Sequence, residues 1–287
     1  MTGILAIFAN PKGTDALRLG AEQRVIQQSI ERSRQRAGLR LEVRHAATVD
    51  DLSRALLDRP YAIVHLSGHG TGRGFVLEDD RGNPFVPPPA ALAKLLGDHS
   101  PPIECVVLNS CYSLTEGVLT ALGVPYTIAS ERPLADAAAI EFTRGFYDAM
   151  GAGRDIKAAY DEGVRRCLLK RFDPRRLPTL LRRAEVRQWP NEKLPIALDD
   201  GSVILPSQVI DKGTCSCERA ACVDATAKVY CYWIRGLSRW VITKRLYHRC
   251  YDQLIRCPRC KRKHKRGHVG KRGKCLQPYV HQVLQRD

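Results

Sequence analysis

Residues 63–70 read IVHLSGHG, and residues 105–113 read CVVLNSCYS. Each stretch is a short apolar run that ends in a turn of small residues, which is the pattern of a buried strand and the turn after it. The first turn carries His69 and the second carries Cys111. If the two strands are neighbours in a parallel sheet, an imidazole base and a thiol nucleophile lie side by side at one edge of that sheet.

Strand-like and helix-like segments alternate along the first 170 residues. This alternation predicts an α/β fold in which a mostly parallel sheet is flanked by helices. In such sheets the functional site lies beyond the carboxyl ends of the strands, where His69 and Cys111 fall. A hairpin is expected over 74–86. The expected strands are 4–8, 41–45, 61–66, 103–108 and 124–128. The expected helices are 16–36, 90–96, 114–122, 134–150 and 154–170. One more helix is expected to be capped by Thr48 or Asp50 and to end near Leu57.

Charge and cysteine divide the chain into parts. The 287 residues carry a net charge of +16, but residues 1–170 hold 20 basic and 20 acidic residues, so the excess lies beyond them. Eight of the 11 cysteines lie between Cys215 and Cys275. We therefore expect an α/β domain over 1–170, a Pro- and Arg-rich linker over 171–213, and a small, basic, Cys-rich domain over 214–287.

The sequence predicts a cytoplasmic protein without a membrane segment. No apolar run approaches the ~18 residues that span a bilayer. Residues 1–8 lack a basic leader and a cleavage site, so we interpret them as a first strand rather than as a signal peptide. In a reducing compartment, clustered cysteines bind metals more often than they form disulfides.

The two strand-end residues have complementary chemistry for acyl transfer. A free cysteine thiol has a pKa of about 8.5, and a neighbouring imidazole can take its proton and later donate one to the leaving amine. We expect the backbone N–H groups of Gly70 and Cys111 to form an oxyanion hole for the carbonyl oxygen. His65 and Cys105, which lie within the strands, are interpreted as packing residues. The alternative is that Cys111 is itself a small buried residue without a catalytic role.

Further motifs accompany the two turns in a fixed order. They are FANPKGT at 8–14 with Leu17, Leu19 and Glu22 after it, VLEDD at 76–80 with GN at 82–83, AAI at 138–140, GFY at 145–147 and GAG at 151–153. In this combination the sequence resembles the caspase-like CHAT peptidases, a family of the same clan as caspases, separase and gingipains. The resemblance implies an endopeptidase with a His69–Cys111 dyad, a protein substrate and no metal in the active site. It also implies activation by a sensor or partner protein, as in bacterial effectors of antiphage defence.

In related enzymes a charged pocket selects the residue before the scissile bond. If this enzyme prefers Arg, its Arg-rich linker is a candidate for self-cleavage near Arg176 or Arg183. Charged residues near the carboxyl edge of the sheet are otherwise solvated loop charges or helix caps. The acidic candidates for the pocket are Asp79, Asp80, Glu131 and Asp136, and the basic candidate is Arg132.

The Cys-rich region has the spacing of a structural zinc site. Cys257-x-x-Cys260 can supply two of the four tetrahedral ligands. Reduced structural thiols and a redox role are the alternatives to zinc. A helix is expected near 226–249, inside this region. The preferred ligands for the remaining two positions are Cys217 and Cys222, and the alternatives are Cys215, His264, His268 and Cys275.

Residues 256–274 form a basic segment with ten Lys or Arg residues and no acidic one. Together with nearby aromatic residues, this composition is typical of a nucleic-acid-binding surface, whose affinity falls steeply as salt is added. The alternative is a solvated basic segment that contacts an acidic protein.

The leading hypothesis is a cysteine endopeptidase whose C-terminal region senses or docks a partner. The first alternative is a catalytically silent adaptor with the caspase-like fold, although an adaptor has no need of His69, Gly70 and Cys111 together. The second alternative is a nucleic-acid-binding protein that acts through its basic Cys-rich region.

Overall fold

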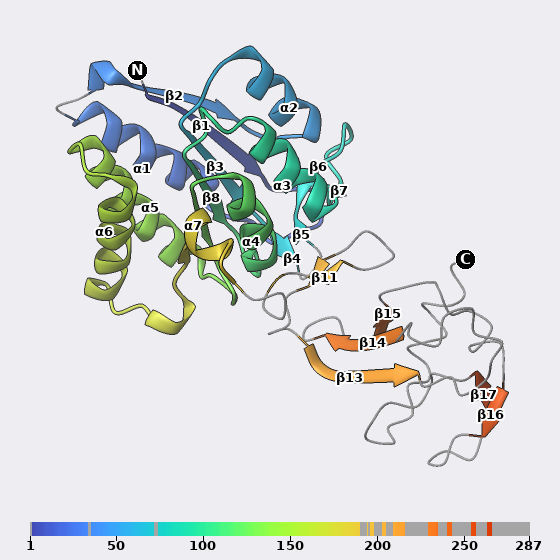
Figure 1. Ribbon diagram of the computed structural model, residues 1–287. Helices are drawn as coiled ribbons and strands as arrows, with labels where there is room; N and C mark the ends of the chain where they lie inside the picture. Colours follow the sequence, from blue (N-terminus) through green and yellow to red (C-terminus); the bar gives the residue numbers. More distant parts are fainter. Residues whose placement is uncertain are drawn as a thin grey trace. The chain divides into compact units, whose positions relative to one another are not determined.

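The computed structural model describes residues 2–33, 36–71 and 74–189, together with Leu194 and the backbone of seven short strands between 196 and 265. The chain forms two units, Met1–Trp189 and Pro190–Asp287. The first unit is a layered α/β structure (Figure 1).

A six-stranded sheet lies at the centre of the first unit. Its strands are β1 Thr2–Ala9, β2 Leu39–Arg44, β3 Ile63–Gly68, β8 Cys105–Asn109, β9 Tyr126–Ala129 and β10 Thr179–Arg182, in the order β10-β9-β8-β3-β1-β2 (Figure 1). Every neighbouring pair is parallel except β10 and β9. β3 and β8 are direct neighbours, and their register pairs Ser67 with Asn109. The predicted α/β fold is confirmed, as is the predicted adjacency of the strands that precede His69 and Cys111.

Helices cover both faces of this sheet. α1 (Leu19–Glu31), α5 (Asp136–Gly151) and α6 (Ile156–Leu169) lie on one face; α2 (Val49–Asp58), α3 (Pro89–Asp98) and α4 (Leu114–Gly123) lie on the other, with α7 (Arg183–Val186) next to α4 (Figure 1). Thr48 caps α2 in a capping box with Asp51, so it is Thr48 of the two predicted caps that is used. Among the described residues, no helix combines the length and the apolar character needed to cross a membrane.

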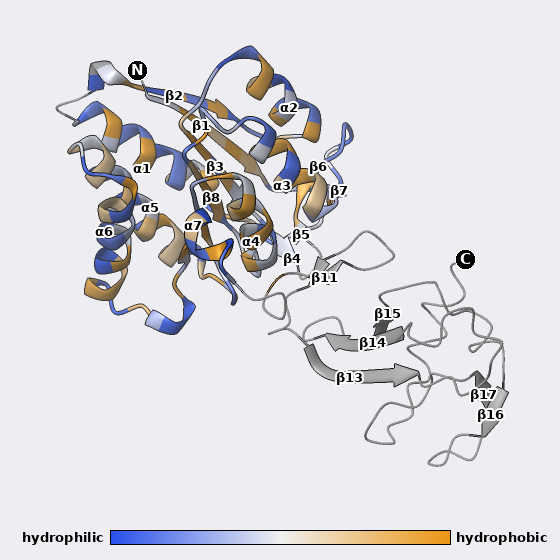
Figure 2. Cartoon of the chain, in the orientation of Figure 1, coloured by the Kyte–Doolittle hydropathy of each residue, from blue (hydrophilic) through white to orange (hydrophobic). Residues whose placement is uncertain are grey.

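Alternate residues of each central strand enter two separate cores. In β1, Leu5 and Ile7 pack on the side of α2 and α3, whereas Ile4 and Phe8 pack on the side of α1, α5 and α6. All four side chains are fully buried. Because both faces are covered, the central strands are mostly apolar, as the hydropathy colouring shows (Figure 2). The buried polar exceptions include His65 and Ser67 in β3 and Asn109 in β8.

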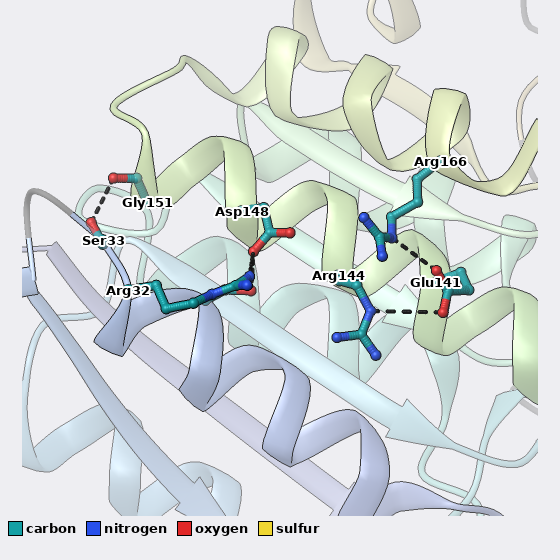
Figure 3. Close-up of polar contacts among 8 residues, drawn as sticks. Arg32, Ser33, Glu141, Arg144, Asp148, Gly151 and Arg166 are labelled. Atoms are coloured by element: carbon teal, nitrogen blue, oxygen red, sulfur yellow. Dashed lines mark hydrogen bonds and ion pairs between the residues drawn. The ribbon is translucent and has the colours of Figure 1, made fainter. Parts of the chain in front are cut away.

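Ion pairs join the three helices on the first face (Figure 3). Arg32, at the end of α1, lies 2.8 Å from Asp148 of α5. Arg166 of α6 lies 2.8 Å from Glu141 of α5. These contacts link α1 and α6 to α5 at the surface of the layer.

The predicted linker over 171–213 contributes the last strand of the sheet. Pro174 begins a short helical turn, Pro174–Arg176, and Pro178 follows it; the chain then pairs β10 with β9. Leu181 of β10 is 4% exposed and joins the core of the first unit. The first unit consequently ends at Trp189 rather than at residue 170.

Two small hairpins follow β3. β4 (Gly70–Thr71) pairs with β5 (Gly74–Phe75), and β6 (Leu77–Glu78) pairs with β7 (Pro84–Phe85). The predicted hairpin over 74–86 therefore forms through β6 and β7, while β5 pairs back toward the His69 turn.

The described parts of the second unit are antiparallel strands. The sequence VYCYWI at 229–234 is rich in aromatic and β-branched residues, which favour strands. The prediction of a helix near 226–249 is therefore wrong, because β14 and β15 lie there. The strand pairs are β11 (Ile196–Ala197) with β12 (Val203–Ile204), β13 (Val209–Cys215) with β14 (Val229–Ile234), β14 with β15 (Trp240–Ile242), and β16 (Leu254–Arg256) with β17 (Lys263–Lys265).

Candidate active site

The turns after β3 and β8 meet at the carboxyl edge of the sheet. A side-chain carbon added at Gly70 would lie 2.0 Å from the Cys111 carbonyl oxygen and 3.0 Å from the Ser110 hydroxyl oxygen. Only glycine permits so close an approach of two backbones. The structure therefore brings together the two turns that carry His69 and Cys111, and both side chains are half-buried.

His69 is oriented by a backbone carbonyl. Its Nε2 atom lies 2.8 Å from the Asp15 carbonyl oxygen. Because a carbonyl oxygen can only accept, Nε2 carries the hydrogen and Nδ1 keeps the lone pair that can take a proton. The loop that holds Asp15 is closed by Asn10, whose side-chain oxygen accepts the Leu17 N–H at 3.1 Å. The motif at 8–14 thus supports the His69 ring.

The Cys111 sulfur lies against the loop that joins β9 to α5. The Leu134 N–H donates to Sγ at 3.3 Å, and the Leu134 carbonyl oxygen lies 3.7 Å from Sγ. This loop is fixed to the Cys111 turn by Ser113, whose hydroxyl accepts the Ser130 N–H at 3.0 Å. The Cys111 sulfur is therefore held between the β8–α4 turn and the β9–α5 loop.

Gly70, one of the two predicted oxyanion-hole donors, lies in the β4–β5 hairpin. The Val76 N–H donates to the His69 carbonyl oxygen at 2.9 Å, so Gly70 and Phe75 form a non-hydrogen-bonded pair of the β4–β5 hairpin. The Gly70 N–H is therefore not used within this hairpin. Its role as a donor to a carbonyl oxygen stays a prediction, as does that of the Cys111 N–H.

An acidic side chain, that of Glu116 in the first turn of α4, lies behind the same hairpin. Its Oε1 atom accepts the Phe75 N–H at 2.8 Å, whereas Oε2 has no hydrogen-bond partner among the described residues. Glu116 is 2% exposed. Burial raises the pKa of this carboxyl to about 7, and the Phe75 hydrogen bond opposes that change only in part.

The five candidate specificity residues, four acidic and one basic, have different surroundings. Asp79 accepts hydrogen bonds within its own turn, and those from Asn83 hold the pKa of Asp79 below its ordinary value. Asp136 forms an ion pair of 2.6 Å with Arg18. Asp80, Glu131 and Arg132 are exposed, and the last two belong to the loop that contacts the Cys111 sulfur.

The predicted zinc ligands fall almost entirely outside the described residues. Cys215 lies in β13 and His264 in β17, where only the backbone is described. Within the described side chains, no group of three or more His, Cys, Asp or Glu residues is arranged to hold a metal ion. The ligands outside the described residues are Cys217, Cys222, Cys257, Cys260, His268 and Cys275.

The fold and the paired turns place the chain among α/β proteins with a thiol and an imidazole at adjacent strand ends. The model of the CHAT domain family matches residues 2–190, and the chain belongs to that family. The family resemblance inferred from the motifs is thereby confirmed. A search of curated proteins finds no match.

Solved structures similar to this chain include three cysteine proteases. A secreted C11 protease from Bacteroides thetaiotaomicron, bound to an irreversible peptide inhibitor, is 12% identical with a TM-score of 0.46 and covers 64% of this chain and 67% of its own. An inactive zymogen C11 protease from Parabacteroides distasonis is 15% identical with a TM-score of 0.46 and covers 65% and 63%. The Arg-specific proteinase gingipain R is 12% identical with a TM-score of 0.44 and covers 84% and 60%. This chain thus spans about two thirds or less of each of these proteins.

Proposed function

We propose that this chain is a cysteine endopeptidase in which Cys111 is the nucleophile and His69 is the general base. The observation that carries the proposal is the backbone contact between the Gly70 and Cys111 turns, combined with the Asp15 carbonyl on His69 Nε2. That hydrogen bond leaves Nδ1 to exchange a proton. Membership of the CHAT domain family supports the same assignment.

The proposed reaction has two stages. The Cys111 thiolate attacks the peptide carbonyl carbon, and the carbonyl oxygen becomes an anion that the Gly70 and Cys111 N–H groups stabilise. The C–N bond then breaks as the protonated His69 donates to the leaving amine, which leaves an acyl thioester on Cys111. In the second stage His69 removes a proton from water, the hydroxide attacks the thioester, and the S–C bond breaks.

A peptide-library cleavage assay on the full chain tests this mechanism. Cys111→Ala and His69→Ala are each expected to lower cleavage by roughly 10³-fold or more. Cys105→Ala is the matched control, because Cys105 is fully buried within β8. Cleavage that survives Cys111→Ala, or that only a chelator abolishes, would contradict the dyad.

The substrate preference forms part of the proposal. Glu131 is exposed in the loop that contacts the Cys111 sulfur, so it is the acidic candidate best placed to meet a basic substrate residue. Glu131→Gln is expected to reduce cleavage after Arg or Lys without altering reactions at other residues. Arg176 and Arg183 lie on either side of β10 in the first unit. Loss of cleavage near either residue in Cys111→Ala, compared with wild type, tests self-cleavage there.

We also propose that the Cys-rich region binds structural zinc and docks a partner, either a sensor protein or a nucleic acid. The Cys257-x-x-Cys260 pair and the basic segment 256–274 support this part of the proposal. Metal analysis should find zinc in the wild type and a reduced content in Cys257→Ser. Binding to nucleic acid should weaken steeply with added salt.

The biological role proposed is that of a cytoplasmic effector protease in bacterial antiphage defence, as the family resemblance implies. Phage plating on cells that carry the wild type or Cys111→Ala tests it. Protection that is equal for both would favour the alternative of a catalytically silent adaptor.

A further inference from the structure

A single buried carboxylate, that of Glu22 in α1, holds the ends of both strands that precede the dyad. The Ser67 hydroxyl at the end of β3 donates to Glu22 Oε2 at 2.6 Å. The Asn109 side-chain amide at the end of β8 donates to Glu22 Oε1. Ser67 lies two residues before His69, and Asn109 lies two residues before Cys111. The carboxylate thus bridges the two points from which the reactive turns depart.

Two further groups contact the Oε1 atom of this carboxylate. His65 Nε2 lies 2.9 Å from Oε1, and the Thr143 hydroxyl of α5 donates to Oε1 at 2.9 Å. Glu22 is 2% exposed, and burial by itself would raise its pKa. The hydrogen bond and charge interaction with His65, and the hydrogen bonds from Ser67 and Asn109, outweigh burial and hold the pKa below its ordinary value. The side chain is therefore a charged acceptor, and hydrogen bonds to charged acceptors are short and strong.

The helix that carries Glu22 is itself fixed. At its far end the Ser29 hydroxyl donates to Asp148 of α5 at 2.7 Å, and Arg32 pairs with the same carboxylate. Ser33, just beyond the helix, donates to the Gly151 carbonyl oxygen (Figure 3). These contacts lie at the end of α1 away from Glu22 and involve neither Ser67 nor Asn109.

We propose that Glu22 is a positioning residue of the dyad, which sets the spacing of His69 and Cys111 by tying Ser67 and Asn109 to one carboxylate. This inference rests on the proposed peptidase function. The turns themselves extend beyond the sheet hydrogen bonds, so their spacing depends on how the last strand residues are held. A displacement of about 1 Å between reacting groups can cost 10²-fold in rate.

The test is the pH dependence of Cys111 alkylation by iodoacetamide in the full chain, with the modified residue identified by mass spectrometry. Only the thiolate reacts, so the profile reports the thiol–imidazole pair without a known substrate or activator. His69→Ala is expected to change how the alkylation rate depends on pH, because the imidazole that exchanges a proton with the thiol is gone. Ser67→Ala and Asn109→Ala are each expected to change this pH dependence in the same direction and to slow alkylation near neutral pH by about tenfold.

Ser29→Ala is the matched control. It removes a buried hydroxyl that donates to a carboxylate at 2.7 Å from the same helix, but it touches neither strand end. The pH dependence of Cys111 alkylation in Ser29→Ala should match that of the wild type. Circular dichroism and thermal unfolding check that all variants are folded. A fall in thermal stability without a change in profile is the expected signature of Ser29→Ala.

The outcomes separate the two claims. If His69→Ala leaves the profile unchanged, the dyad itself is absent and the proposed function fails together with this inference. If His69→Ala shifts the profile while folded Ser67→Ala and Asn109→Ala do not, only the positioning role is overturned. An equal shift in Ser29→Ala would also overturn it, because the effect would then follow general loosening of α1.

Discussion

Glu22 and Glu116 are both fully buried carboxyl groups near the dyad, yet their surroundings differ. Glu22, on the side of α1, accepts hydrogen bonds from His65, Ser67, Asn109 and Thr143. Glu116, on the side of α4, accepts one N–H. Burial raises the pKa of each, but only at Glu22 do the donors reverse the direction. The number of donors, rather than burial, therefore decides which acid is charged near neutral pH.

The two acids also support different parts of the site. Glu22 ties the ends of β3 and β8, whereas Glu116 ties α4 to the hairpin that contains Gly70. A side-chain carbon added at Gly74 would lie 2.9 Å from Glu116 Oε1, so this hairpin packs directly on the acid. One acid holds the strands of the dyad and the other holds the expected oxyanion-hole turn.

The largest expected difference between the two acids is in folding stability after replacement by leucine. Glu22→Leu should lower the free energy of unfolding by about 3–5 kcal/mol, because several buried donors lose their charged partner. Glu116→Leu should change it by about 1 kcal/mol or less, since one N–H loses an acceptor while a buried carboxyl is removed. Urea unfolding of the full chain measures both. Equal losses would contradict the contrast.

The next prediction concerns the pH dependence that Glu116 imposes. Its pKa rises from 4.5 to about 7 on folding, so the folded state binds the proton more tightly than the unfolded state. Stability from this group is complete below pH 4.5 and is lost as pH rises through 7. Glu116→Gln should therefore gain about 3 kcal/mol over wild type between about pH 4 and pH 8, since one pKa unit is about 1.4 kcal/mol. An unchanged difference between these conditions in urea unfolding would show that the acid is not held neutral.

Glu22 should show the opposite slope. Its pKa is lowered on folding, so its stabilisation is present above the ordinary value of 4.5 and is lost as pH falls through the lower folded value. Wild type should consequently lose more stability on acidification below 4.5 than Glu22→Gln does. Thermal unfolding across the acid range compares the two. Parallel curves would mean that Glu22 is not charged in the folded protein.

The smallest effect is expected at an exposed pair that resembles neither buried acid. Arg18 and Asp136 form an ion pair with 62% and 29% of their side chains exposed. Asp136→Asn should lower the free energy of unfolding by less than about 1 kcal/mol, because solvent screens such pairs. A changed cleavage preference in this variant would restore Asp136 as a specificity residue.

The sequence predicted the parts of the site that have side-chain signatures. Apolar runs that end in small-residue turns pointed to His69 and Cys111. The alternation of strands and helices predicted a parallel sheet in which their two strands are neighbours. The Asp15 carbonyl and the Leu134 N–H could not be predicted, because both act through the backbone and any residue type supplies them. The role of Glu22 was hidden because its partners come from separate elements. β10 was missed because four residues between prolines and arginines give too short a pattern.

The central claim is that Cys111 attacks the substrate and carries its acyl group. Intact-mass measurement after acid quenching, during turnover of a peptide that the library assay selects, tests it most directly. A mass increase equal to the acyl half of the peptide is expected, located at Cys111 and missing from Cys111→Ala. Cleavage without any adduct at Cys111, or with the adduct at another residue, would contradict it.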